Sequence, residues 1–276
     1  MTVGISSTLA RRQLGRRLRT HREAVGKTGD DVVESGLVGR NKLWQIETGT
    51  ITVKQGDVLA LARLYRVTTA ATDEMVALAD ATKIANFEEE YGASVPEWVG
   101  IYSDLETGAV VLSDYNPELL HGLLQTEAYA RAVMQTEPTL TQEVVEQRVQ
   151  FRMARQRAFF SRPTPGKLHV VVPEGVLRLV VGSAAVMEEQ IAHLRAVDER
   201  DGVSVRVLPA TGGAYSGMNG RFTILDFAEP DEDPSVVYLE YLVGSRYLER
   251  PDQVGTFRGT FGRMWERASP MREYVP

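Results

Sequence analysis

Residues 28–49 read TGDDVVESGLVGRNKLWQIETG, and this stretch decides the fold of the N-terminal part of the chain. Thr28 and Asp31 have the spacing of a capping box, which starts a helix. Gly36 ends that short helix, and a second helix is expected from about residue 39 to residue 48. Its inward residues are Leu43 and Ile46. Two short helices joined by a tight turn predict a helix-turn-helix unit.

The flanking residues extend this unit to five helices. A helix is expected over 9–25, with Leu14, Leu18 and Val25 on one face, and Gly26 ends it. Thr52 and Gln55 have the spacing of a second capping box before a fourth helix, and a fifth helical pattern covers roughly 70–81. We therefore predict an all-α five-helix domain over residues 1–82.

The charge of the chain is unevenly distributed. The net charge of the 276 residues is −6, but residues 1–66 carry 12 Lys/Arg against 6 Asp/Glu, whereas residues 67–276 carry 19 against 31. A small basic part joined to a larger acidic one indicates contact with nucleic acid through the basic part. The alternative is a solvated basic helix without a polyanionic partner.

The composition excludes several other classes of protein. The apolar fraction of 43% and the charged fraction of 25% are ordinary for a globular chain. Cysteine is absent, which excludes disulfides, thiolate metal sites and cysteine nucleophiles. The sequence contains no apolar run of about 18 residues and no secretory signal. We expect a cytoplasmic protein with no membrane association.

The second helix of the helix-turn-helix carries the side chains that a base-reading surface needs. Its outward residues are Arg40, Asn41, Lys42, Trp44 and Gln45. Arginine pairs with guanine edges, asparagine and glutamine pair with adenine edges, and lysine suits phosphate. Trp44 is large for a residue that faces a groove, and the alternative is packing against a partner subunit or a neighbouring helix.

Residues 14–67 resemble the helix-turn-helix of phage-repressor-like regulators, the XRE or Cro/C family. The most specific part is the ending Ile46-Glu47-Thr48-Gly49, which matches the family pattern I-E-x-G. The resemblance implies that Arg40, Asn41 and Gln45 read base edges. It also implies that Arg22 and Glu47 form a buried ion pair with a structural role.

Two positions depart from that family. Gly29 stands where the family usually carries a glutamine that contacts phosphate. The backbone N–H of Gly29 at the helix start, together with Thr28, can bind phosphate instead. Leu37 stands at the usual turn glycine, where a positive φ would cost about 1 kcal/mol. We therefore expect Gly36 to make the turn.

The remaining chain has the pattern of an α+β domain. Residues 83–95 are predicted as a linker and residues 96–276 as the domain. Helices are expected near 96–106, 119–135, 141–160, 183–200 and 252–268, and strands near 110–113, 168–172, 203–208, 222–227 and 236–239. Residues 168–208 read strand, helix, helix, strand, an order that permits a parallel pair of strands.

Residues 122–132, GLLQTEAYARA, resemble a motif of WhiJ-like actinobacterial regulators. This likeness extends over about 96–270. In such regulators a domain of uncharacterised role follows the helix-turn-helix, and the likeness implies a small BldB-like acidic protein as its partner. From its apolar pattern alone, the motif is an amphipathic helix that packs into the core through Leu123, Leu124 and Tyr129.

Motifs for catalysis are missing from the sequence. The four histidines form no His-x-x-x-His pair, and neither a phosphate-binding loop nor a Gly-x-Ser-x-Gly elbow occurs. We expect no enzyme, no cofactor and no metal. Arg148, Arg152 and Arg155 follow helical spacing. They either bind an acidic protein, a ligand or DNA, or pair with carboxylates of their own domain.

These features together predict a DNA-binding transcriptional regulator, a repressor of nearby genes that binds double-stranded DNA as a homodimer. Its C-terminal domain is expected to bind a partner protein or a ligand. The first alternative is an antitoxin-like protein that neutralises a small partner and autoregulates its operon. The second is an enzyme within residues 96–276.

Overall fold

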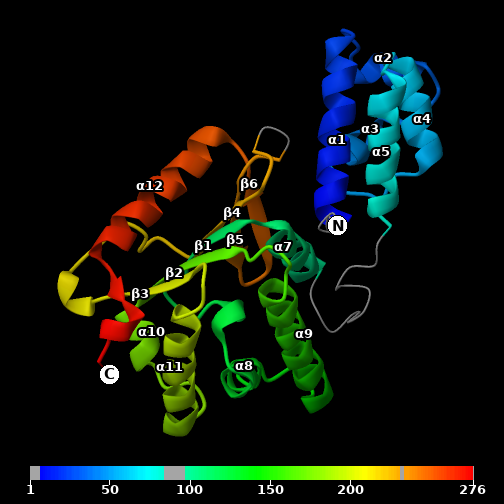
Figure 1. The fold of residues 1–276 in the computed structure, drawn as a ribbon. Coiled ribbons are helices and arrows are strands. Elements are labelled where there is room, and N and C mark those ends of the chain that lie inside the picture. Colours follow the sequence, from blue (N-terminus) through cyan, green and yellow to red (C-terminus); the bar gives the residue numbers. More distant parts are fainter. Residues whose placement is uncertain (1–6, 84–96, 231–232, 276) are drawn as a thin grey trace. The chain divides into compact units, whose positions relative to one another are not determined.

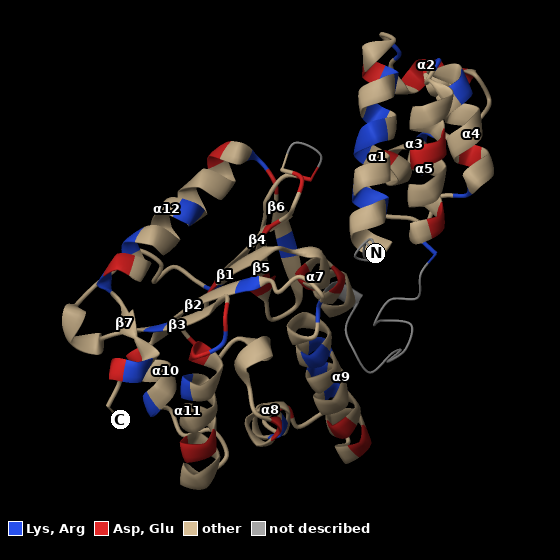
Figure 2. Ribbon diagram, viewed as in Figure 1, with Lys and Arg blue, Asp and Glu red and all other residues tan. Residues whose placement is uncertain are grey.

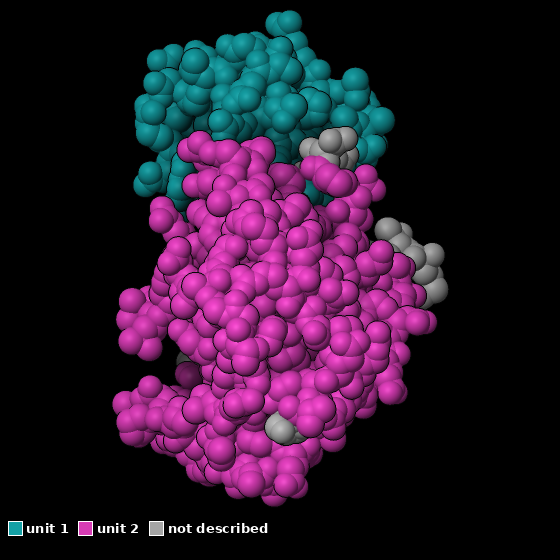
Figure 3. Space-filling view, turned by 90° about the vertical axis from the view of Figure 1, so that its left-hand side faces the viewer, with its two compact units in different colours: residues 1–90, 231–233 teal, residues 91–230, 234–276 magenta. Residues whose placement is uncertain are grey.

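The computed structural model describes residues 7–83, 97–230 and 233–275. The chain divides into two compact units, the first formed by residues 1–90 with 231–233 and the second by residues 91–230 with 234–276 (Figures 1 and 3). The linker predicted over 83–95 lies outside the described residues except for Lys83. None of the described helices is long and apolar enough to cross a membrane.

The first unit has five described helices, as predicted. They are α1 (Ser7–Ala24), α2 (Gly29–Glu34), α3 (Arg40–Glu47), α4 (Gln55–Leu64) and α5 (Thr69–Ala81). Each helix contributes buried side chains to one core, among them Leu14, Val32, Ile46, Leu61 and Met75. Val25 was predicted on the apolar face of the first helix, but α1 ends one residue earlier and Val25 is exposed.

Local signals set the two helices of the motif. The Thr28 hydroxyl accepts a hydrogen bond from the Asp31 N–H at 3.2 Å, and the Asp31 carboxylate accepts one from the Thr28 N–H at 2.6 Å, so the predicted capping box is confirmed. Gly36 has a φ of 75° and makes the turn as predicted, which spares Leu37 that conformation.

The second capping box, predicted from Thr52 and Gln55, is wrong. Helix α4 begins at Gln55 with Lys54 as its N-cap residue, and no side chain caps it. The Thr52 hydroxyl lies 3.5 Å from the carbonyl oxygen of Thr82. Val53 is buried in the core, and the next residue, Lys54, has an extended backbone, so the helix cannot start at Thr52.

The second unit is built on one seven-stranded sheet, in the order β6-β5-β4-β1-β2-β3-β7. The strands are β1 (Val111–Tyr115), β2 (Lys167–Pro173), β3 (Val203–Leu208), β4 (Phe222–Asp226), β5 (Val236–Tyr241), β6 (Gly244–Leu248) and β7 (Ser269–Pro270). β2 runs parallel to both β1 and β3, and the other neighbours are antiparallel. The mixed sheet with its helices confirms the α+β class, although β6 and β7 were not predicted.

Helices cover both faces of this sheet (Figure 1). They are α7 (Glu97–Gly108), α8 (Glu127–Met134), α9 (Gln142–Phe160), α10 (Glu174–Arg178), α11 (Ala184–Asp198) and α12 (Pro251–Arg267). Tyr115 packs in the core under α12, together with Phe261 and Met264. Successive side chains of a strand point to opposite faces, so Asp114 points away from α12, toward α7 and α9. α10 and α11 connect the parallel strands β2 and β3, as the order of predicted elements permitted.

The helix predicted over 119–135 is wrong in its first half. Residues Gly122–Leu124 form a short 3-10 helix, η2, and α8 starts only after Thr126. Glutamine side chains from other helices bind the intervening backbone. The Gln190 side chain accepts from the Thr126 N–H and donates to the Leu124 carbonyl, both at 2.7 Å, and Gln156 donates to the Gly122 carbonyl at 2.8 Å. These bonds replace those of an α-helix. The predicted core role is right, since Leu123, Leu124 and Tyr129 are buried.

Candidate functional site

Helix α3 presents a polar face with a large aromatic side chain at its centre. Arg40 and Asn41 are exposed, Trp44 is 62% exposed, and Lys42 and Gln45 are half-buried. Leu43 and Ile46 point into the core. The exposure of Trp44 rules out packing against a neighbouring described helix as its role. An exposed side chain of this size can contact DNA or a partner subunit.

Both cations of α3 are held by aspartates. The Arg40 guanidinium lies 2.5 Å from the Asp30 carboxylate, and the Lys42 ammonium lies 2.8 Å from that of Asp57. Arg40 and Asp30 are both exposed, and an exposed pair contributes at most about 1 kcal/mol. Arg40 can therefore exchange Asp30 for a base edge at little energetic cost.

The ion pair implied by the family resemblance is present. Arg22 donates to the two carboxylate oxygens of Glu47, at 2.6 and 2.9 Å, and a third nitrogen donates to the Lys27 carbonyl at 2.8 Å. The side chains of Arg22 and Glu47 are 11% and 12% exposed. The hydrogen bond to Glu47 raises the pKa of Arg22. This bidentate pair ties α1 to the end of α3 and makes no part of the exposed face.

Two glycines let α1 approach α3 closely. A Cβ atom on Gly15 would lie 2.3 Å from the Ile46 carbonyl oxygen. Gly49 has a φ of 69°, and a Cβ there would lie 2.9 Å from the backbone of Arg12. Gly49 is part of the I-E-x-G ending, whereas the sequence reasoning missed Gly15. A glycine in the interior of a helix destabilises it, and that conflict is the signal that could have identified Gly15 as a contact position.

The start of α2, where Thr28 and Gly29 were predicted to contact phosphate, has a mixed electrostatic character. Hydrogen bonds from Thr28 lower the pKa of Asp31; the bond from the backbone N–H has the larger effect and the bond from the hydroxyl the smaller. Asp30 and Asp31 therefore place two carboxylates beside this helix end. Helix α1 carries more Lys and Arg than any other described helix of this unit (Figure 2). The phosphate contacts of Thr28 and Gly29 stay predictions.

A second candidate site lies in the α+β unit, in a cavity of about 160 Å³ between the sheet and α7 and α9. Charged and polar side chains from α7, η2, α9 and three strands of the sheet line it. These include Tyr102 from α7, Asp114 from β1, His121 and Gln125 around η2, Arg152 and Arg155 from α9, and Thr223 and Glu240 from the sheet. Sequence reasoning missed this site because its members come from separate segments of the chain, the first at Tyr102 and the last at Glu240.

Next to this cavity, Glu106 and Arg155 form a closed pair. Arg155 donates to both carboxylate oxygens of Glu106, at 3.0 and 2.8 Å, and both side chains are buried. Glu106 therefore has little capacity left for a ligand. No group of three His, Asp or Glu side chains among the described residues is arranged to hold a metal ion.

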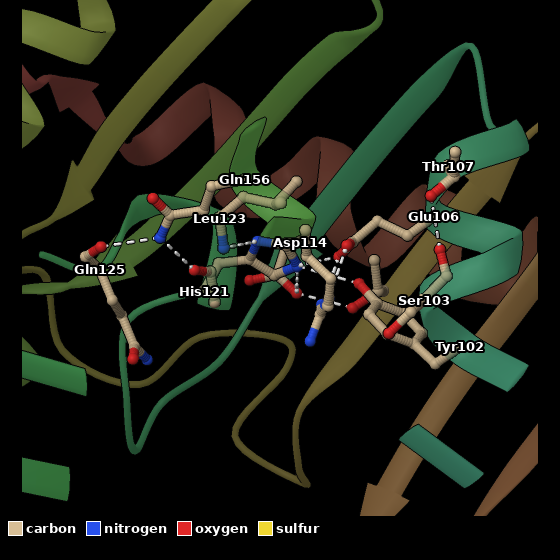
Figure 4. Close-up of polar contacts among 12 residues, drawn as sticks. Tyr102, Ser103, Glu106, Thr107, Asp114, His121, Leu123, Gln125 and Gln156 are labelled. Carbon is tan, nitrogen blue, oxygen red and sulfur yellow. Dashed lines mark hydrogen bonds and ion pairs between the residues drawn. The ribbon is translucent and has the colours of Figure 1, made fainter. Parts of the chain in front are cut away.

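His121 sits at the centre of the cluster (Figure 4). Its Nδ1 accepts from the Leu123 N–H at 3.3 Å, so the proton of the neutral ring lies on Nε2. Nε2 lies 3.0 Å from the Tyr102 hydroxyl and 3.9 Å from Asp114 Oδ1. The backbone of the GLLQT motif thus sets the hydrogen-bonding direction of His121.

Arg152 and Arg155, which were predicted at helical spacing on one helix, have different environments. Arg155 pairs with a carboxylate of its own domain, which was one of the two alternatives. Arg152 instead donates to the amide oxygen of Gln125, and its Nε is buried without a hydrogen-bond partner among the described residues. Burial, and then the charge of Arg155, lowers the pKa of Arg152 to about 10.

The five helices, with the capped α2 and the exposed face of α3 among them, define a helix-turn-helix unit. The partner of such a unit is DNA. A family model described as a helix-turn-helix domain matches residues 13–75. A second model, described as "Domain of unknown function (DUF5753)", matches residues 100–273, more than half of the chain, and the chain belongs to this family. No curated protein and no solved structure matches the chain.

Proposed function

We propose that this protein is a sequence-specific transcriptional regulator that represses nearby genes from a double-stranded operator. The observation that carries the proposal is the exposed polar face of α3, whose opposite side is fixed by contacts with α1. The Arg22–Glu47 pair and the close contact at Gly15 hold α3 in one orientation. A rigid support of this kind is what base readout requires, because hydrogen bonds to base edges are directional.

The side chains of this face have separate roles in the proposal. Arg40 reads a guanine edge, and Asn41 and Gln45 read adenine edges. Lys42, Thr28 and Gly29 contact phosphates, which position the helix without reading sequence. Trp44 makes apolar contact with a thymine methyl group or with the partner subunit of a homodimer.

The experiment is a selection of genomic fragments by the full chain, followed by gel-shift titration of the best fragment at several salt concentrations. Log affinity should fall linearly with log salt, because each neutralised phosphate releases counterions. Arg40→Ala should lose about 1–3 kcal/mol of discrimination at one base position. Arg19→Ala is the matched control: it removes an exposed arginine of α1 that is paired with Glu23.

The two variants separate the outcomes. The control, Arg19→Ala, should leave the discrimination between base sequences unchanged. An equal loss on all sequences for Arg40→Ala would show that Arg40 contacts phosphate alone. Failure of the unmodified chain to enrich any fragment would overturn the DNA-binding proposal itself.

For the α+β unit we propose regulation by binding, without catalysis and without a cofactor, in the cytoplasm. The resemblance to WhiJ-like regulators supports a small BldB-like acidic protein as one partner. A pull-down with the full chain followed by mass spectrometry tests this. The antitoxin-like alternative makes a different prediction: deletion of the gene should then be tolerated only when the partner gene is deleted as well. Turnover of a substrate by the α+β unit would contradict a purely binding role.

A further inference from the structure

We propose that the cavity between the sheet and helices α7 and α9 binds a small carboxylic acid that carries a hydrogen-bond donor at its other end. Arg152 takes the carboxylate, and Asp114 takes the donor. The proposal deepens the sensing role proposed above and rests on it for its regulatory consequence. Binding itself is tested without DNA.

Arg152 supplies the anion-binding half of the site. It lines the cavity, yet no carboxylate of the described residues forms an ion pair with it. Within the described part of the chain, its one hydrogen bond goes to the neutral amide of Gln125, and its buried Nε has no partner. Arg152 is half-buried, and the charges of Glu240 and Glu106 act on it without forming an ion pair. A partly enclosed cation of this kind is stabilised when a ligand places a carboxylate against it. A guanidinium with a free Nε edge suits a planar carboxylate.

Asp114 supplies the second half. The residue is only 4% exposed, and it lines the same cavity. Thr223 donates to Oδ1 at 2.7 Å, whereas Oδ2 is buried without a hydrogen-bond partner among the described residues. Burial raises the pKa of this carboxyl. An ammonium or hydroxyl group of a ligand would satisfy Oδ2, since a carboxylate accepts and does not donate.

The walls between these two groups limit the size of the ligand. A volume of 160 Å³ corresponds to about five water molecules, well below that of a drug-sized pocket. The lining alternates aromatic and aliphatic side chains with the polar ones, among them Tyr102, Tyr238, Leu119 and Val133. A molecule of the size of an amino acid or a short hydroxy acid, with a small apolar body, fits this description.

The charges argue against inorganic phosphate as the occupant. The carboxylate of Glu106 occupies Arg155, and Arg221 lies near the carboxylates of Glu118 and Glu240, at 3.6 and 3.8 Å. Arg152 can therefore compensate the single negative charge of a monocarboxylate. A dianion such as phosphate would also be repelled by the carboxylates of Asp114 and Glu240, which line the same cavity. A monocarboxylate with a donor group satisfies both unpaired atoms.

The test is a thermal-shift and calorimetric survey of the full chain, without DNA, using three matched sets of probes. The sets are small apolar L-amino acids, the corresponding 2-hydroxy acids, and the corresponding amines that lack the carboxylate. We expect at least one acid to raise Tm and bind with a measurable Kd, and its amine to do neither. Comparison of the amino acid with the hydroxy acid identifies which donor Asp114 accepts.

Three variants make the test specific. Arg152→Met should weaken binding of the acid at least tenfold and leave Tm without ligand unchanged or higher, because it removes a half-buried charge that forms no ion pair among the described residues. Asp114→Asn should weaken the amino acid more than the hydroxy acid. Arg157→Met is the matched control on the same helix: its side chain is exposed and does not line this cavity, so binding should be retained.

Several outcomes would overturn the proposal. They are an absence of stabilisation by every acid of the survey, undiminished binding by Arg152→Met, or stabilisation by inorganic phosphate in place of the acids. Loss of DNA binding by the full chain would contradict the proposed function but leave these ligand measurements intact. The two failures are therefore distinguishable.

Discussion

At the scale of single residues, Glu47 decides how firmly α3 is held. Its carboxylate accepts two hydrogen bonds from Arg22 at the junction of α1 and α3, where both side chains are almost fully enclosed. Removing one member of a buried pair leaves the other charge without compensation, which costs about 3–5 kcal/mol. Glu47 is therefore a stability residue whose effect on DNA binding is indirect.

We expect Glu47→Ala to lower the free energy of unfolding of the first unit by this amount. Amide hydrogen exchange of α1 and α3 in the full chain measures it. Glu74→Ala is the control, because its partner Arg17 is bound in an exposed pair that contributes at most about 1 kcal/mol. Similar exchange in the two variants would show that the Arg22–Glu47 pair does not stabilise the unit.

At the scale of elements, the packing of α1 on α3 depends on Gly15. A methyl group there would lie 2.3 Å from the Ile46 carbonyl oxygen, so Gly15→Ala must push the two helices apart. We expect it to destabilise the unit by about 1–3 kcal/mol or more and to weaken operator binding. Calorimetric melting and gel-shift titration measure the two effects.

Gly56→Ala provides the opposite control. Gly56 is in α4, and a Cβ atom there would meet nothing within 4 Å. The same substitution should therefore stabilise the chain by about 0.5–1 kcal/mol, because alanine is the better helix former. If both variants were stabilised, the close approach of α1 and α3 would not exist in solution.

The start of α2 should depend on pH. The hydrogen bonds from Thr28 lower the pKa of Asp31 in the folded protein, so their stabilisation is complete above the ordinary pKa of an aspartate, about 4. It is lost as the pH falls through the lowered value. In calorimetric melts, Asp31→Ala should be less stable than the unmodified chain at pH 7, and the difference should shrink in strong acid.

Glu34→Ala is the control for this measurement. It removes an exposed carboxylate from the same helix and leaves the capping box intact. This variant should therefore still lose the stabilisation by the capping box when the pH becomes acidic. A difference between Asp31→Ala and the unmodified chain that stays constant down to pH 2 would contradict the role of the Asp31 charge.

At the scale of the whole molecule, regulation requires that a ligand of the α+β unit bind the DNA-free and DNA-bound states unequally. We expect an acid that binds at Arg152 to change operator affinity, and the operator to change the affinity for that acid by the same factor, because coupling between two sites is reciprocal. Gel-shift titration with and without the acid, and calorimetry with and without operator, measure the two sides of this cycle. An acid that binds tightly without changing operator affinity would make the cavity unrelated to regulation.

Much of the first unit could be predicted from the sequence alone. The capping box of Thr28 and Asp31, the turn at Gly36 and the apolar spacing of α3 are formed by residues a few positions apart, so local chemistry determines them. The same holds for most strands of the second unit, whose β-branched runs are bounded by turn residues. Edge strand β6 begins with Gly244 and Ser245 and has little apolar pattern, so it was missed.

Where a local sequence signal conflicts with contacts from distant residues, the tertiary structure alone determined the backbone conformation. Thr52 and Gln55 have the spacing of a cap, but Val53 is buried in the core, Lys54 is extended and the helix begins only at Gln55. Residues 122–125 have a helical pattern, but the side chains of Gln156 and Gln190 bind their backbone. The cavity with Asp114 and Arg152 was out of reach for the same reason. Its residues come from separate segments, and no spacing along the chain encodes their meeting.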